Sequence, residues 1–164
     1  MQVSDDLNNI FNFKIGRRAK VNPQTAIEDI IIEMQKQGFT YGGISPTGNP
    51  LNYNSKKPVS YRHFVIGDFI GDFIVIDTKT DCRFDNMLRL KEDYDFTLQA
   101  ITECGGIVRL NYYGSDFVHR TNAGGAVGYR TSVLEKESII YLMQKWGGAI
   151  KLHPSRENEI IIKL

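Results

Sequence analysis

The sequence lacks the features that mark membrane, secreted or strongly basic nucleic-acid-binding proteins. No apolar run approaches the roughly 20 residues that a membrane helix requires. The first residues are polar and acidic, unlike a signal peptide. Lys and Arg total 20 and Asp and Glu total 19, so a net charge of +1 excludes a strong overall attraction to nucleic acid, although a local basic patch is compatible with it. These absences predict a cytoplasmic protein.

Cysteine is also scarce. Cys82 and Cys104 show neither CxxC spacing nor a disulfide-rich pattern, so a reducing compartment is expected. The remaining composition, 41% hydrophobic and 24% charged, is that of an ordinary globular protein. A chain of 164 residues can close a hydrophobic core without cross-links. We therefore expect one domain over residues 1–164.

Three segments have the periodicity and end signals of helices. The first spans residues 22–38, with an asparagine N-cap, a proline in the first turn and a glycine at the end. The second runs from about 93 to 104 and stops at two glycines. The third runs from about 133 to 146, where Ser132 and Glu135 have the spacing of a capping box.

Strands are predicted between and after these helices. Residues 59–77 form a strand pattern interrupted by glycines, and 107–113 and 159–164 are hydrophobic enough for strands. Residues 38–58 are rich in glycine, proline and asparagine and predict a loop, used as a lid or a flexible insertion. Strands and helices mix without strict alternation. This order favours an α/β domain with a mixed sheet and flanking helices, with α+β as the alternative.

Two groups of carboxylates are candidates for chemistry. Asp5 and Asp6 follow a strand-like start, and hard divalent cations prefer such oxygen ligands, although a solvated acidic turn explains them equally well. Glu92, Asp93 and Asp95 stand at a helix start, where negative charge is favoured by about 0.3–1 kcal/mol each. A structural role therefore accounts for them. A catalytic role requires one of them to face a cleft as a general base.

A histidine and a glycine turn form a third candidate. His119 ends a strand pattern and precedes the Gly124-Gly125 turn. A single histidine is usually structural, but imidazole also suits manganese-type sites built with carboxylates. The turn can direct backbone N–H groups at an anion, and Arg120 and Arg130 add positive charge. These residues are compatible with a diphosphate site.

In combination these motifs resemble a known family. Residues 84–87 (Phe-Asp-Asn-Met), 91–99 (Lys-Glu-Asp-Tyr-Asp-Phe-Thr-Leu-Gln) and 119–125 (His-Arg-Thr-Asn-Ala-Gly-Gly) closely resemble glycosyltransferases of the GT-A fold. The nearest resemblance is to the bacteriophage group associated with DNA-base hydroxylases, the TET/JBP-associated glycosyltransferases. Ser4-Asp5-Asp6 then falls where that fold carries its Asp-x-Asp metal motif. The resemblance covers most of the chain.

The resemblance implies a role for each candidate. Asp6, with Asp5 beside it, and His119 would hold a divalent metal, manganese or magnesium. Asp93, next to Glu92, would deprotonate the acceptor hydroxyl. The reaction would be metal-dependent transfer of a sugar from a nucleotide sugar to a hydroxyl, which is a modified DNA base in the resembling group. The residues implied in binding the donor diphosphate are Arg120, Thr121, Asn122, Gly124 and Gly125.

Two departures from the family pattern suggest an alternative. Ser4 stands where the first aspartate of the metal motif is expected, and the chain begins where the nucleotide-binding half of a GT-A fold would precede it. We therefore expect a GT-A-like fold truncated at that half. The alternative is a catalytically incomplete remnant that binds a protein, such as a phage counter-defence inhibitor of the anti-CRISPR type. Such a remnant would pair with its partner, or with a second copy, through an exposed sheet edge in the bacterial host cell.

Overall fold

The computed structural model describes residues 7–14, 16–49, 51, 53, 56, 58–60, 70–117 and 128–163. This part of the chain is a mixed α/β structure with three α-helices, as the sequence predicted. Its elements are β1 (Leu7–Asn12), β2 (Ala19–Val21), α1 (Pro23–Gln37), β3 (Tyr41–Ser45), β4 (Val59–Ser60), β5 (Ile74–Ile76), α2 (Glu92–Thr102), β6 (Val108–Phe117), α3 (Ser132–Trp146), a 3-10 turn (Gly147–Ala149), β7 (Ile150–Leu152) and β8 (Ile160–Ile162).

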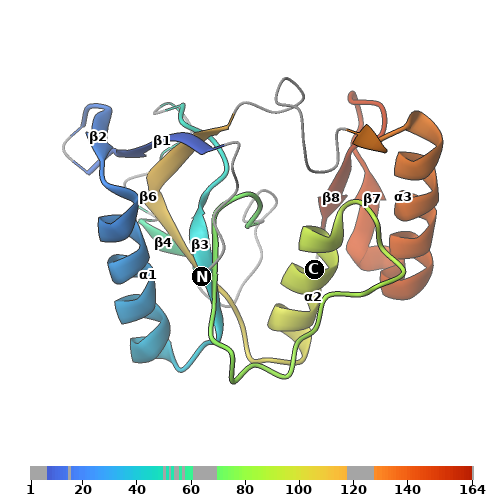
Figure 1. Ribbon diagram of the computed structural model, residues 1–164, viewed down its shortest axis with the longest axis horizontal. Helices are drawn as coiled ribbons and strands as arrows, with labels where there is room; N and C mark the ends of the chain where they lie inside the picture. Colours follow the sequence, from blue (N-terminus) through green and yellow to red (C-terminus); the bar gives the residue numbers. More distant parts are fainter. Residues whose placement is uncertain are drawn as a thin grey trace.

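The main sheet is mixed and is built around β6. Its strand order is β2-β1-β6-β3-β5, and β4 also pairs with β6. Strand β3 runs parallel to β6, whereas β1 and β4 run antiparallel to it. Residues 108–115 of β6 are all buried, because elements cover both faces of the sheet (Figure 1). Residues 7–12 and 19–21, for which the sequence gave no clear strand prediction, form the antiparallel pair β1–β2.

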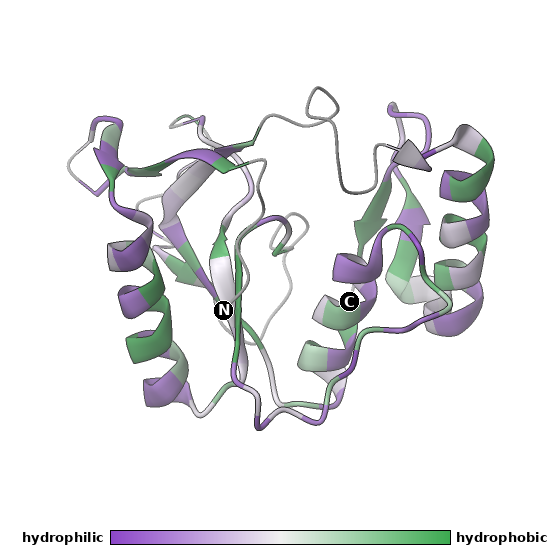
Figure 2. Ribbon diagram, in the orientation of Figure 1, coloured by the Kyte–Doolittle hydropathy of each residue, from purple (hydrophilic) through white to green (hydrophobic). Residues whose placement is uncertain are grey.

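Helix α1 covers one face of the sheet and begins and ends as predicted. The side chain of Asn22 accepts a hydrogen bond from the backbone N–H of Gln24, and Gly38 ends the helix at φ 70°. Ala26, Ile30 and Met34 are buried against the sheet. Figure 2 shows this hydrophobic side of α1 turned toward the strands and its hydrophilic side turned away.

Strand β3 corrects the prediction of a loop over residues 38–58. It runs through the centre of the sheet, and its glycines are required by close packing on both faces. A Cβ on Gly42 would lie 2.7 Å from Ile30 Cγ2, and one on Gly43 would lie 2.5 Å from the carbonyl oxygen of Phe73. Glycine in a strand often marks such an approach of another group to the backbone.

Within the strand predicted over residues 59–77, the described residues form strands at 59–60 and at 74–76. Val59 and Ser60 form β4, and residues 74–76 form β5, which pairs with β3. Residues 70–73 are not a strand, and residues 61–69 lie outside the described part of the chain.

The second half of the chain adds further layers beside the sheet (Figure 1). Helix α2 packs on the face opposite α1 through a cluster that includes Tyr41, Phe96 and Ile107. The antiparallel hairpin β7–β8 and helix α3 then pack against α2 through a cluster that includes Leu98 and Leu142. The predicted helices and the last predicted strand, β8, are therefore confirmed, and β7 was not predicted.

The N-cap of α3 differs from the predicted capping box. Thr131 is the cap, and its hydroxyl accepts a hydrogen bond of 3.1 Å from the backbone N–H of Leu134. Ser132 is the first helical residue, so Glu135 lies one position too late to complete a box. Glu135 forms an ion pair with Arg130 at 3.6 Å instead.

The two cysteines are paired, although their spacing did not indicate a disulfide. Cys82 and Cys104 form a disulfide with a Cα–Cα distance of 6.8 Å. Their separation of 22 residues has no recognisable motif, and the pair meets because helix α2 lies between them and reverses the chain. Among the described residues, no helix is both long enough and apolar enough to cross a membrane.

Candidate functional site

The start of α2 holds the predicted base, Asp93. Lys91 adopts a left-handed conformation at φ 64°, and the helix begins with Glu92. Asp93 is half-buried, and its Oδ1 accepts a hydrogen bond of 3.0 Å from the backbone N–H of Tyr94. Burial, followed by the charges of Glu92 and Asp72, raises the pKa of Asp93 to about 7. A carboxylate that titrates near neutrality is suited to general-base catalysis.

Asp72 is a participant that the sequence did not identify. It lies before β5, on a segment remote from α2 in sequence, yet its charge acts on both Asp93 and Tyr94. In the sequence, the Gly71-Asp72 pair indicated only that the predicted strand is interrupted there. Its proximity to α2 depends on how the chain folds back, which no local pattern records.

A neutral, buried phenol lies below the start of α2. The hydroxyl of Tyr41 lies 3.4 Å from Thr97 Oγ1, one helical turn after Asp93, and donates a bond of 3.4 Å to the carbonyl oxygen of Ile70. Burial raises the pKa of Tyr41 well above its ordinary value. This phenol therefore stays protonated at neutral pH and serves as packing and as a hydrogen-bond donor.

Asp95 has a structural role. Its carboxylate is completely buried and accepts bonds from Gln99 Nε2 at 2.6 Å, Trp146 Nε1 at 2.7 Å and Lys145 Nζ at 2.9 Å. Lys145 also binds Asp85 at 2.8 Å, so it connects two carboxylates. A buried charge is tolerated only when it is paired and hydrogen-bonded in this way. This network joins the first turns of α2 to the end of α3, and Asp95 itself lines neither of the pockets described below.

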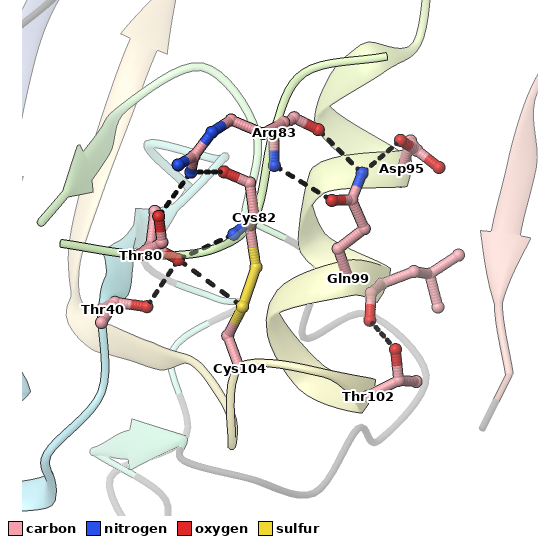
Figure 3. Close-up of a disulfide and its surroundings, with 9 residues drawn as sticks. Thr40, Thr80, Cys82, Arg83, Asp95, Gln99, Thr102 and Cys104 are labelled. Carbon is pink, nitrogen blue, oxygen red and sulfur yellow. Dashed lines mark hydrogen bonds between the residues drawn. A yellow bond between two sulfur atoms is a disulfide. The ribbon is translucent and has the colours of Figure 1, made fainter. Parts of the chain in front are cut away.

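The segment before α2 is fixed to the helix at several points (Figure 3). The side-chain amide of Gln99 binds the backbone of Arg83 twice: its Nε2 donates to the carbonyl oxygen at 2.9 Å, and its Oε1 accepts from the N–H at 3.1 Å. The disulfide attaches the preceding residue, Cys82, to Cys104 just beyond the helix. These contacts hold residues 82–83 in one position relative to α2.

The next residues of this segment continue the attachment. The ring of Phe84 lies 4.6 Å, centroid to centroid, from that of Phe96. The carboxylate of Asp85 accepts bonds from Lys145 Nζ at 2.8 Å and Tyr141 OH at 2.9 Å. The Lys145 hydrogen bond is the largest of the effects that lower the pKa of Asp85 to about 2. Asp85 is therefore ionised throughout the physiological range.

A small pocket lies where this segment meets the start of α2. Its volume is about 360 Å³, and its lining residues are Phe84, Asp85, Asn86, Leu88 and Glu92. A larger hollow of about 600 Å³ lies on α3 and the β7–β8 hairpin, but it contains none of the predicted site residues. The smaller pocket is the candidate site because Glu92 lines it and Asp93 follows directly in the chain.

Of the predicted site residues, Glu92 lines this pocket, and Asp93 is its neighbour in the chain but is not a lining residue. Within the described part of the chain, no group of three or more His, Cys, Asp or Glu side chains is arranged to hold a metal ion. The predicted residues that lie outside the described part are Asp5, Asp6, His119, Arg120, Thr121, Asn122, Gly124 and Gly125. Two carboxylates and an imidazole are a donor set that suits manganese or magnesium, and this assignment stays a prediction.

Comparison with family models, with curated proteins and with solved structures gave no match. The functional argument therefore depends on the residues of the site and their surroundings.

Proposed function

We propose that this protein is a glycosyltransferase of the GT-A type, which transfers a sugar from a nucleotide sugar to a hydroxyl acceptor. The observation that carries the proposal is Asp93, a half-buried carboxylate at a helix start, which follows the pocket residue Glu92 in the chain and has its pKa raised to about 7. Carboxylates at exposed helix starts normally titrate near 4. The elevated pKa is the property that a base acting on a hydroxyl near neutral pH requires.

In the proposed reaction Asp93 accepts the proton of the acceptor hydroxyl as the oxygen attacks the anomeric carbon. The bond from that carbon to the diphosphate oxygen breaks, and the nucleoside diphosphate leaves with the electron pair. Asp5, Asp6 and His119 would hold the divalent metal, manganese or magnesium, which when bound offsets the charge of the departing diphosphate. The turn over residues 120–125 would contact the same diphosphate through its backbone N–H groups and Arg120.

Release of nucleoside diphosphate from a panel of nucleotide sugars, measured with manganese present, tests this function. The acceptor in the assay is a hydroxymethylpyrimidine in DNA, beside a reaction without acceptor. We expect Asp93→Asn to lower the transfer rate by about 10²–10⁴-fold, the usual contribution of a general base. Asp81→Asn is the matched control, because Asp81 is exposed and lies outside the pocket. A protein that neither binds nor turns over any donor would disprove the proposal.

The alternative function, a protein-binding inhibitor, depends on a sheet edge that can accept a partner strand. The edge strands β2 and β5 of the described sheet have three residues each, and short edges offer few backbone groups for pairing. The present geometry therefore favours the enzyme. Native mass measurement alone and with bacterial nuclease complexes distinguishes the two, since the inhibitor would form a stoichiometric complex.

A further inference from the structure

One wall of the candidate pocket is an exposed aromatic ring. Phe84 is 45% exposed, although large apolar side chains are usually buried. Its ring stacks beside the buried Phe96, in a pair that stabilises the arrangement by about 0.5–1.5 kcal/mol beyond area burial. Phe84 thus presents part of a flat apolar surface to the pocket.

This ring is held in place by contacts on both sides of it in the chain. Arg83 is bound through its backbone to Gln99, and Asp85 is bound to Lys145. The backbone on either side of Phe84 is therefore held in one position, and in this position the Phe84 ring is partly exposed. A binding surface that is fixed before the ligand arrives loses less conformational entropy on binding.

The polar groups of the pocket define which ligands it can take. Among the described residues that line it, Glu92 supplies a carboxylate, Asn86 supplies an amide and Asp85 supplies a carboxylate already bonded to Lys145 and Tyr141, and none is Lys, Arg or His. Carboxylates repel phosphate and accept hydrogen bonds from hydroxyl and amino groups. The pocket therefore suits an uncharged ring compound with hydroxyl or amino donors, and the donor diphosphate must bind elsewhere.

We propose that this pocket is the acceptor subsite, in which an uncharged ring lies against Phe84 and donates hydrogen bonds to Asn86 and Glu92. The assignment rests on the proposed function, in which Asp93, the residue after the pocket residue Glu92, is the base that acts on the acceptor. A volume of about 360 Å³ is at the lower end of the range for ligand sites, about 300–1,000 Å³, and accommodates a single ring system. Both a nucleobase and a sugar have a face that can lie against an aromatic ring, so either kind of compound could supply the ring that binds here.

Ligand-observed NMR titration with two uncharged probes tests the subsite and separates these sources. The probes are a hydroxymethylpyrimidine nucleoside and methyl β-D-glucopyranoside, and inorganic pyrophosphate is the anionic comparison. We expect at least one uncharged probe to bind and pyrophosphate not to compete with it. Phe84→Ala should weaken binding by about 5–150-fold, the range that corresponds to stacking of a ring on an aromatic side chain.

Two further variants show whether a loss of binding comes from the pocket itself or from a loss of folded protein. Asn86→Ala changes an exposed side chain and should weaken binding several-fold with an unaltered melting temperature. Met87→Ala is the matched control: Met87 is 74% exposed on the same segment but does not line the pocket, so binding should stay at the wild-type level. Equal binding of an uncharged probe by wild type, Phe84→Ala and Asn86→Ala would overturn the subsite, as would binding of neither probe.

The enzymatic assay separates the subsite from the proposed function. If the protein transfers sugar but Phe84→Ala leaves the acceptor KM unchanged, the function stands and the subsite is wrong. If the uncharged probe binds at Phe84 but no nucleotide sugar is bound or consumed, the pocket remains a ligand site and its assignment to an acceptor is overturned with the function. We expect a raised acceptor KM and an unchanged donor KM.

Discussion

Breaking the Cys82–Cys104 disulfide should lower the free energy of unfolding by about 3 kcal/mol. The bond closes a loop across a separation of 22 residues. For a loop of that length the chain-entropy model gives about 11 cal/mol/K, or about 3 kcal/mol at 25 °C. In a chain of this size such a loss corresponds to a melting temperature lower by about 6–12 °C.

Equilibrium urea unfolding of the oxidised protein, with and without a phosphine reductant, measures this loss directly. Alkylation followed by intact-mass measurement counts the free thiols in each sample. The double variant Cys82→Ala/Cys104→Ala should unfold near the reduced protein, and reductant should not change it further. Two alkylated cysteines in the native protein after mild oxidation, or an unfolding midpoint that reductant leaves in place, would refute the pairing.

Three further substitutions test the packing and charges around α2. Gly43→Ala brings a methyl group within 2.5 Å of the carbonyl oxygen of Phe73 and should destabilise the fold by about 1–3 kcal/mol in urea unfolding; a stabilised variant would contradict the close approach. Asp95→Ala removes the acceptor of the Gln99 and Trp146 donors, while Lys145 keeps Asp85, and should cost about 1–3 kcal/mol by the same measurement; a loss below about 0.5 kcal/mol would show that the network is dispensable. Asp93 has a folded pKa of about 7 against an ordinary 3.8, so it takes stability away as pH rises from about 4 to 7. Asp93→Asn should therefore melt above wild type at pH 8 and near it at pH 4, and equal melting temperatures at both would contradict the raised pKa.

The helices were predictable because their ends are encoded locally. The N-cap and the final glycine of α1 each act on backbone groups within a few residues. The error at α3, where Thr131 rather than Ser132 is the cap, shows the limit of such patterns: two adjacent hydroxyls carry the same signal, and the entry direction of the chain decides between them.

Strand β3 was not predicted because glycine occurs both in turns and in strands where another group packs closely against the backbone. In residues 38–58 the sequence indicated turns, whereas Gly42 and Gly43 are there because α1 and the segment at Phe73 approach the strand from either side. That meaning depends on two segments that are remote in sequence, so composition does not reveal it.

The candidate site was predictable only in part. The helix start offered three carboxylates, and the resemblance to glycosyltransferases singled out Asp93 among them. The raised pKa of Asp93 depends on burial and on the charges of Glu92 and Asp72, and neither burial nor Asp72 is contained in a local pattern. Asp95 has the same sequence signal as Asp93, yet it points into a network with Lys145 and Trp146. Asp95 follows Asp93 by two residues and therefore lies on a different side of the helix, so a candidate base and a structural carboxylate are close in sequence but differ in their surroundings.

The pH dependence of sugar transfer by wild type and Asp93→Asn tests most directly whether Asp93 is the catalytic base. Because the base must be ionised, kcat/KM should rise with pH through about 7 and then level off in the wild type. The variant should be slower by about 10²–10⁴-fold and should lack this rise. A variant that keeps both the wild-type rate and the wild-type profile would contradict the account.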